Sequence, residues 1–140
     1  MKGTEFLNKI AISITPVGSR VTCNPPPTNT DEDYLVLIDV EDDQRFHMAN
    51  VMHAHGFKYE GDEAYGIDAI STDDLTAITG FKSFRCGDIN LIVTSNTVFH
   101  ERFLAASARA KELNLMLKAE RVALFQTVLY GAPYAQRKPY

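Results

Sequence analysis

Residues 10–40 read IAISITPVGSRVTCNPPPTNTDEDYLVLIDV, and this stretch decides the fold. Its last part, residues 34–40, is an almost continuous run of apolar and β-branched residues, which is typical of a strand buried on both faces of a sheet. Isoleucines at alternate positions of residues 10–14 predict an earlier strand that leads into Gly18. The proline-rich residues 15–30 are expected to form an exposed loop between the two strands.

The acidic cluster Asp31, Glu32 and Asp33 stands at the head of the second predicted strand. Because side chains at i and i+2 of a strand point to the same side, Asp31 and Asp33 can share a metal while Glu32 points elsewhere. Divalent cations stabilise the charge that develops when a nucleotidyl group is transferred, and Mg²⁺ or Mn²⁺ prefers carboxylate oxygens. We expect Asp31 and Asp33 to hold such a metal and one of them to act as general base, since no histidine lies near the motif.

Gly18 and Ser19 are the residues expected to bind the phosphates of the same substrate. A glycine lets the backbone approach a phosphate closely, and the following N–H groups and the serine hydroxyl can bind phosphate oxygens. Arg20 adds positive charge directly after them. We therefore expect a triphosphate to bind at Gly18, Ser19 and Arg20.

A third metal ligand is expected on a later strand. Asp88 opens the apolar segment DINLIVT after Gly87, and Asn90 shares its face as a neutral ligand or as an orienter of a bound water. The alternative for Asp88 is an acid of a solvated turn. Arg85, just before the glycine, is a candidate to bind phosphate, with a solvated strand edge as the alternative.

These residues resemble the nucleotidyltransferase superfamily typified by DNA polymerase beta, whose signature is Gly-Ser, a loop, and Asp-x-Asp leading into an apolar strand. The resemblance covers residues 10–40. It implies a triphosphate role for Gly18 and Ser19, and a metal role for Asp31, Asp33 and Asp88. Residues 81–94 and 113–131 are also similar to uncharacterised phage-encoded nucleotidyltransferase-like proteins. Three consecutive prolines in the loop, and an acid placed at a strand edge, depart from the superfamily pattern.

The rest of the chain predicts further elements of an α/β domain. Acids at 42–43 followed by apolar residues predict a helix that stops at Gly56, and residues 57–80 predict a strand or hairpin followed by a short capped helix. The alternating residues 81–94, broken at Gly87, predict a hairpin. Apolar residues spaced by three and four predict helices over 97–114 and 118–130.

Lys118 and Arg121 lie near the junction of the last two predicted helices. They are candidates to hold a substrate phosphate, and an exposed helix face with acidic partners is the alternative. We expect a single domain over residues 1–131 and a loose tail over 132–140.

The composition of the chain argues against two classes of protein, those that coat nucleic acid and those that span a membrane. The net charge of -4 gives no broad basic surface for coating nucleic acid, and no apolar run approaches the roughly 20 residues that span a bilayer. Cys23 and Cys86 form no metal or redox motif and are expected to be free thiols. We expect a cytoplasmic protein without membrane attachment, located in the host cytoplasm if the protein is phage-encoded.

The sequence thus predicts an α/β domain with a short mixed sheet flanked by helices, two of them C-terminal, and a magnesium–triphosphate site. The expected activity is transfer of a nucleoside monophosphate from a nucleoside triphosphate to a hydroxyl or phosphate on RNA, protein or a small molecule. The alternative is a non-catalytic module that binds a nucleotide or a partner protein, such as a toxin–antitoxin or phage anti-defence component. A metal-dependent nucleotide hydrolase is a third hypothesis, and a homo-oligomer or a partner protein is compatible with each of them.

Overall fold

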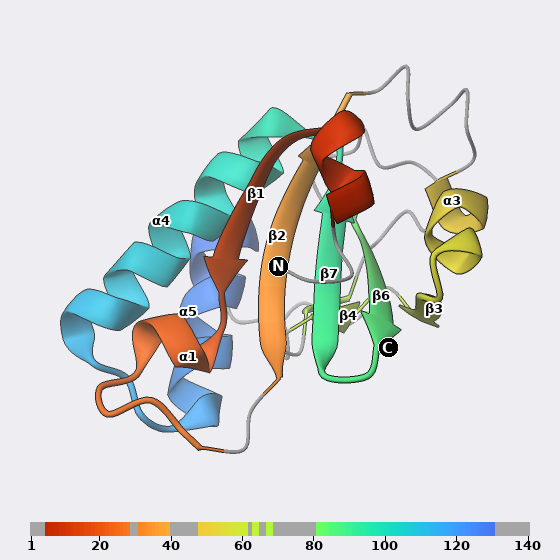
Figure 1. Ribbon diagram of the computed structural model, residues 1–140. Helices are drawn as coiled ribbons and strands as arrows, with labels where there is room; N and C mark the ends of the chain where they lie inside the picture. The colour runs from red at the N-terminus through yellow and green to blue at the C-terminus, as the bar shows by residue number, and fades with distance from the viewer. Residues whose placement is uncertain are drawn as a thin grey trace, which may run out of the picture.

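The computed structural model describes residues 5–28, 31–39, 48–61, 63–64, 67–68 and 81–130. A short 3₁₀ helix, several strands and four α-helices make up this part of the chain (Figure 1). In chain order they are η1 (Glu5–Lys9), β1 (Ala11–Val17), α1 (Ser19–Thr22), β2 (Glu32–Ile38), α3 (Met48–Ala54), β3 (Lys58–Gly61), β4 (Glu63–Ala64), β5 (Ile67–Asp68), β6 (Lys82–Cys86), β7 (Ile89–Thr94), α4 (Thr97–Leu113) and α5 (Lys118–Tyr130).

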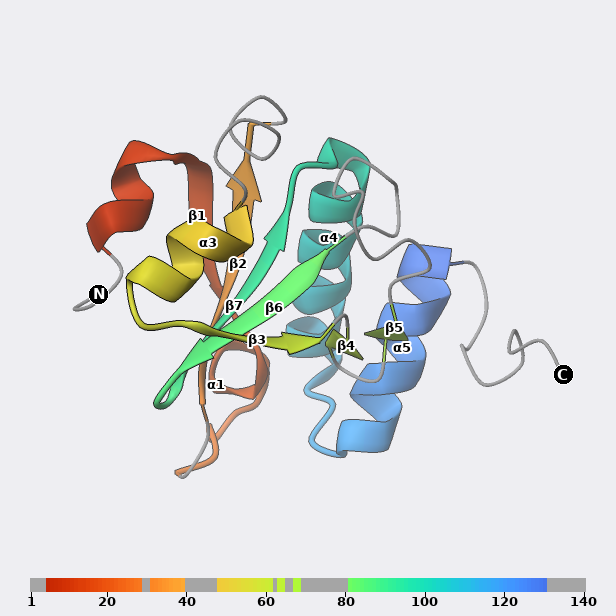
Figure 2. The same ribbon diagram turned by 90° about the vertical axis from the view of Figure 1, so that its right-hand side faces the viewer.

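A five-stranded mixed sheet of order β1-β2-β7-β6-β3 forms the middle layer. Within the described strands, β2 and β7 pair in parallel, and the other neighbours in this sheet are antiparallel. Figure 2 shows α4 and α5 on one face, and η1 and α3 on the other. The predicted fold class, a short mixed sheet flanked by helices with two of them C-terminal, is confirmed.

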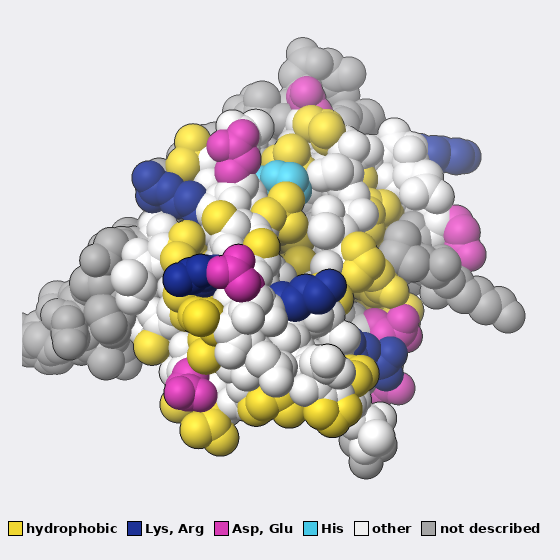
Figure 3. All heavy atoms as spheres, turned by 90° about the vertical axis from the view of Figure 1, so that its left-hand side faces the viewer, with side chains coloured by type: hydrophobic (Ala, Val, Ile, Leu, Met, Phe, Trp, Pro, Cys, Tyr) yellow, Lys and Arg dark blue, Asp and Glu magenta, His cyan; other side chains and the backbone are white. Residues whose placement is uncertain are grey.

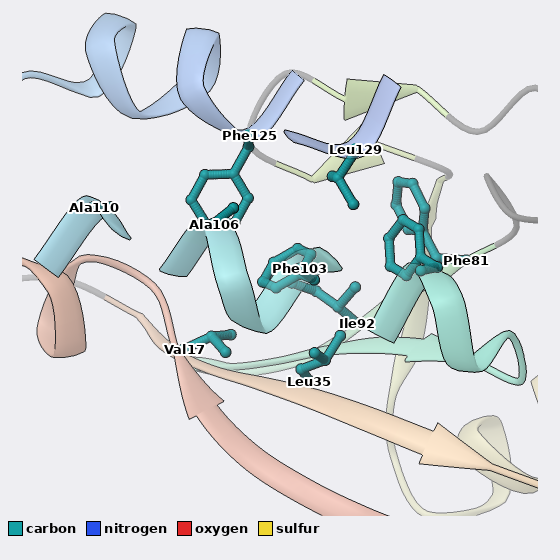
Figure 4. Packing of buried hydrophobic residues seen from close by; sticks show 10 residues of the cluster. Val17, Leu35, Phe81, Ile92, Phe103, Ala106, Ala110, Phe125 and Leu129 are labelled. Atoms are coloured by element: carbon teal, nitrogen blue, oxygen red, sulfur yellow. The ribbon is translucent and has the colours of Figure 1, made fainter. Parts of the chain in front are cut away.

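The face under α4 and α5 carries an aromatic core (Figure 4). The ring centroid of Phe103 lies 5.9 Å from that of Phe99 and 4.9 Å from that of Phe125, and all three side chains are buried. Leu35 of β2 and Ile92 of β7 complete this cluster from the sheet. The spacing of apolar residues by three and four thus predicted both helices and most of the buried face of α4, although Leu113 at its end is exposed.

The prediction of a loop over residues 15–30 is wrong in two places. β1 continues to Val17, and a helical turn, α1, follows directly. Gly18 makes the change of direction possible because its φ of 87° is unfavourable for residues with a side chain. Its carbonyl then accepts hydrogen bonds from the amides of Val21 and Thr22 at 3.0 and 3.1 Å, which is the start of a helix rather than an open loop.

The hairpin predicted over residues 81–94 is confirmed as β6 and β7. Its two-residue turn holds Gly87, whose φ is 60°, and Asp88. The parallel pairing of β2 with β7 extends beyond the strand ends, since the amide of Glu32 donates to the carbonyl of Asp88 at 2.7 Å. This bond joins the turn to the segment that carries the acidic cluster.

Several predictions fall on residues that the structure does not describe. They are the start of the helix at 42–43, the short capped helix within 69–80 and the tail over 132–140. The predicted stop of the earlier helix is confirmed, because α3 ends at Ala54 and Gly56 has a φ of 88°. None of the helices in the described part of the chain is long and apolar enough to cross a membrane.

Arg121 secures the connection between α4 and α5. Its Nη1 donates to the carbonyls of Leu115 and Met116, each at 2.9 Å, and lies 3.3 Å from Sγ of Cys23. Cys23 is a buried free thiol that also donates to the carbonyl of Leu115 at 3.6 Å. The arginine therefore holds both the helix connection and the segment that follows α1.

Replacing Arg121 by glutamine should lower the free energy of unfolding by about 2 kcal/mol, because two carbonyls lose a charged donor. Lys118, an exposed residue one turn earlier in α5, is the matched control, and Lys118→Gln should stay within about 0.5 kcal/mol of the parent. Urea denaturation followed by circular dichroism measures both variants. Equal losses in the two variants would contradict the structural role of Arg121.

Candidate functional site

The predicted site residues meet at one end of the sheet, where β1 ends and β2 and β7 begin (lower end in Figure 1). Val17 of β1 pairs with Asp33 of β2, so that Gly18 and Ser19 follow directly beside the acidic cluster. Asp33 in turn pairs with Asn90 of β7. The register thus brings the Gly-Ser pair, the acids and the hairpin turn to one edge.

A row of polar residues crosses the sheet at this level. The register joins Asp33 to Asn90, Asn90 to Arg85 and Arg85 to Lys58, one residue from each of four adjacent strands. Residues paired in register share a face of the sheet, and this face is the one that α4 and α5 cover further along the strands. We call Asp33, Asn90, Arg85 and Lys58 the polar row.

Both aspartates of the cluster have polar partners. Nη1 of Arg85 lies 2.8 Å from Oδ2 of Asp31, and Nδ2 of Asn90 donates to Oδ1 of Asp33 at 3.2 Å. The side chains of Arg85 and Asp31 are 33% and 44% exposed, so water screens their ion pair. A pair of this kind contributes little stability and can exchange with a ligand at small cost.

Glu32 points away from the two aspartates, as the strand period predicted. Its Oε1 accepts a hydrogen bond of 3.0 Å from the hydroxyl of Tyr34. Burial and then this bond to Glu32 raise the pKa of Tyr34, while the charge of Arg20 acts in the opposite direction. Arg20, Glu32, Asp33 and Tyr34 contribute to the lining of a pocket of about 70 Å³ between β1, α1 and β2.

Asp88 lies in the exposed hairpin turn, and β7 itself begins one residue later. Its backbone is held beside Glu32 by the 2.7 Å hydrogen bond from the Glu32 amide. Across the residues that the structure describes, no three histidine, cysteine, aspartate or glutamate side chains gather closely enough to hold a metal ion. Asp88 as third metal ligand therefore stays a prediction.

The donor set fits one magnesium ion. Mg²⁺ is commonly held by one or two carboxylates, with substrate phosphates and waters completing its octahedron. Asp33 of β2 and Asp31, which directly precedes this strand, provide two carboxylates, and their partners include a screened arginine and a neutral amide. A second ion would need a further acid, for which Asp88 is the nearest candidate in sequence and register.

The basic candidates separate into two groups. Arg20 and Arg85 lie at the site edge, in the small pocket and in the polar row. Arg121 is directed at the α4–α5 connection, and Lys118 is exposed at the first residue of α5. Lys58 was missed, because only the register of β3 with β6 reveals that it continues the polar row.

Asn90 is the register partner of Asp33, so a carboxylate at position 90 would add a further acid to the site. Asn90→Asp should lower thermal stability without divalent ions, by about 1 kcal/mol, because like charges then face each other across the strands. Millimolar Mg²⁺ should restore this loss. Asn90→Ala removes the same hydrogen bond without adding charge, so thermal unfolding at constant ionic strength should show no magnesium effect in that control. A similar magnesium response in both variants would argue against a metal-binding edge.

Comparison with known proteins supports the fold. No known family model matches the sequence, and no curated protein is significantly similar to it. Among solved structures, the crystal structure of the conserved protein GrpB from Enterococcus faecalis matches with a TM-score of 0.54 and 14% sequence identity, over 96% of this chain and 88% of that chain. At this identity the match establishes the fold alone, an α/β domain with a mixed sheet.

Proposed function

We propose that this protein is a magnesium-dependent nucleotidyltransferase that moves a nucleoside monophosphate from a nucleoside triphosphate to a hydroxyl or phosphate acceptor. One observation carries the proposal: the register of β1, β2 and β7 joins Val17 to Asp33 and Asp33 to Asn90. It gathers a glycine–serine turn, two aspartates at the start of β2 and a hairpin turn at one sheet edge. A triphosphate and its metal need these three parts within reach of one another.

Gly18, Ser19 and Arg20 would bind the phosphates. Gly18 offers bare backbone, Ser19 a hydroxyl, and Arg20 a cation that also lines the 70 Å³ pocket. That pocket is too small for a whole nucleotide, since pockets for molecules of that size usually reach several hundred Å³. It suits a phosphate group, with the nucleoside lying on the open surface beside it.

Arg85 would act as an exchangeable counter-ion. In the unliganded protein it balances Asp31 through the 2.8 Å ion pair. Phosphate oxygens compete for a guanidinium group, and an arginine that turns to them leaves Asp31 available to a metal. Magnesium at Asp31 and Asp33 would neutralise charge on the phosphates and lower the pKa of the attacking hydroxyl. Asp88, in its exposed turn, would supply the third carboxylate.

The proposal is tested by incubating the protein with each α-³²P-labelled triphosphate, Mg²⁺ and extracts that contain RNA, protein and small molecules. We expect label transfer that falls at least a hundredfold in Asp31→Asn and Asp33→Asn, because each change removes a metal-binding charge. Asp39→Asn is the matched control. It changes an exposed aspartate of the same segment, about 20 Å along the chain from Asp33, and should keep full activity.

Asp88→Asn separates the enzyme from its alternative. A loss as large as that in Asp33→Asn supports a third carboxylate, whereas full activity would exclude that role for Asp88. Absence of transfer by the parent protein with every triphosphate would contradict the enzyme itself.

A binding module of the same fold is the second candidate. Large apolar side chains are exposed around the end of α4 and the connection to α5, namely Leu113 at 49%, Met116 at 45% and Leu117 at 65%. Hydrophobic side chains also gather along the lower edge of the face in Figure 3, the end of the molecule where this connection lies. Clustered apolar exposure favours contact with another protein. Pull-down that depends on Leu117, in a protein without transferase activity, would favour this candidate.

A further inference from the structure

Ser13 of β1 and His100 of α4 meet away from the sheet edge that carries the acidic cluster. Oγ of Ser13 lies 3.2 Å from Nε2 of His100, within hydrogen-bonding distance, although 87 positions separate the two residues in the chain. Ser13 pairs with Leu37 of β2, four residues beyond Asp33, so the contact lies roughly 13 Å along the strand from the acids. We call Ser13 and His100 the serine–histidine pair.

The course of β1 directs Ser13 towards α4. The register of β1 against β2 shifts between Ala11 and Ser13, which is typical of a β-bulge. Beyond this shift side chains alternate along the strand, so Ser13 shares a face with Val17, a member of the core under α4. The fold therefore turns the serine hydroxyl to the helix that carries His100.

The imidazole of His100 is suited to accept a proton. Burial lowers the pKa of His100 from its ordinary value of 6.5, so the ring is neutral at pH 7. The negative charge of Glu101 acts in the opposite direction and favours the ring once it is protonated. With the ring proton on Nδ1, Nε2 accepts the hydrogen bond from the Ser13 hydroxyl. A neutral imidazole in this contact can act as general base for the hydroxyl.

The surroundings of the serine–histidine pair admit a small reactant. Both side chains are half-buried, so neither is closed off from solvent. Exposed apolar residues lie next to them in sequence, Ile12 at 62% directly before Ser13 and Val98 at 41% in the first turn of α4. Figure 3, which faces the side of α4, shows a histidine at the surface beside hydrophobic side chains. Such a surface favours an uncharged reactant.

We propose that Ser13 is a nucleophile that accepts an acyl group from a small, uncharged carboxylic ester, with His100 as general base. Oγ of Ser13 forms a bond to the carbonyl carbon, and the bond between this carbon and the ester oxygen breaks. The hydroxyl proton passes to Nε2 of His100 and from there to the departing alkoxide. The step requires neither metal nor nucleotide, so the proposal does not rest on nucleotidyl transfer.

Acetylation by p-nitrophenyl acetate tests the proposal. The reaction is stopped with acid, and neutral hydroxylamine then removes acetyl groups from cysteine and histidine but leaves the ester on a serine. Residues 10–20 form one tryptic peptide, in which tandem mass spectrometry distinguishes Ser13 from the other hydroxyls. We expect Ser13 to be acetylated at least about a hundredfold faster in the folded protein than in urea, because only the fold supplies the base.

His100→Gln should slow the acetylation of Ser13 by about a hundredfold or more, because glutamine can accept the hydrogen bond but not the proton. His53→Gln is the matched control, since it removes an exposed imidazole from α3 and should keep the parent rate. Ser13→Ala should abolish the acetylated site. Thr15→Val removes a hydroxyl two residues along the same strand face and should leave the labelling of Ser13 intact.

The pH dependence of the parent protein provides a test that needs no variant. Because only the neutral ring takes the proton, the rate should fall as the pH is lowered through the depressed pKa of His100, and should level off above it. A rate that rises with hydroxide concentration without levelling off would contradict the role of His100. Equal rates in folded and unfolded protein, or the parent rate in a folded His100→Gln variant, would overturn the proposal, since a purely structural hydrogen bond predicts both.

Discussion

The parallel pairing of β2 with β7 is the constraint on which the rest of the structure depends. Parallel strands begin at the same edge of a sheet, so this pairing brings the acidic cluster of β2 beside the hairpin turn that precedes β7. The antiparallel partners β1 and β6 then add the Gly-Ser turn and Arg85 to the same edge. A shift of one residue in this register would turn every polar side chain of the row to the opposite face.

The two faces of β2 and β7 explain why this register is well defined. Alternate residues contribute to two separate cores, one with α4 and α5 and the other with η1 and α3. Leu35 and Ile92 lie two residues beyond Asp33 and Asn90 on the same face and are fully buried. The buried core therefore gives way to a polar edge within two residues of each strand. The charged groups at this edge are hydrated, and the strands still hold them at fixed positions.

Charge at the edge is balanced in part. Asp31 faces Arg85 and Asp33 faces the amide of Asn90, so two aspartates stand close together without an uncompensated pair of like charges. The Arg85 ion pair thus offsets one of the two aspartate charges, and the Asn90 amide gives the other a hydrogen bond.

The sequence predicted the helices over 97–114 and 118–130, the hairpin over 81–94 and the strand that carries the acids, because each depends on periodicity within a short segment. The sequence did not predict the helical turn after Gly18. The high proline content of residues 15–30 favoured a loop, whereas the amides of Val21 and Thr22 donate to the Gly18 carbonyl and form a helical turn. The placement of Asn90 beside Asp33, and of Lys58 beside Arg85, follows from strand register. Register depends on packing between distant segments, which periodicity within one segment does not reveal.

The most direct test of a metal–triphosphate site at this edge is an NMR titration of ¹⁵N-labelled protein with ATP and trace Mn²⁺. Paramagnetic broadening falls steeply with distance from the ion. The account predicts early loss of the Gly18 backbone amide and the Asn90 side-chain amide, while amides at the other end of the same strands, at Leu37 and Thr94, persist. Uniform broadening, or early broadening at Leu37 and Thr94 with Gly18 and Asn90 unaffected, would contradict it.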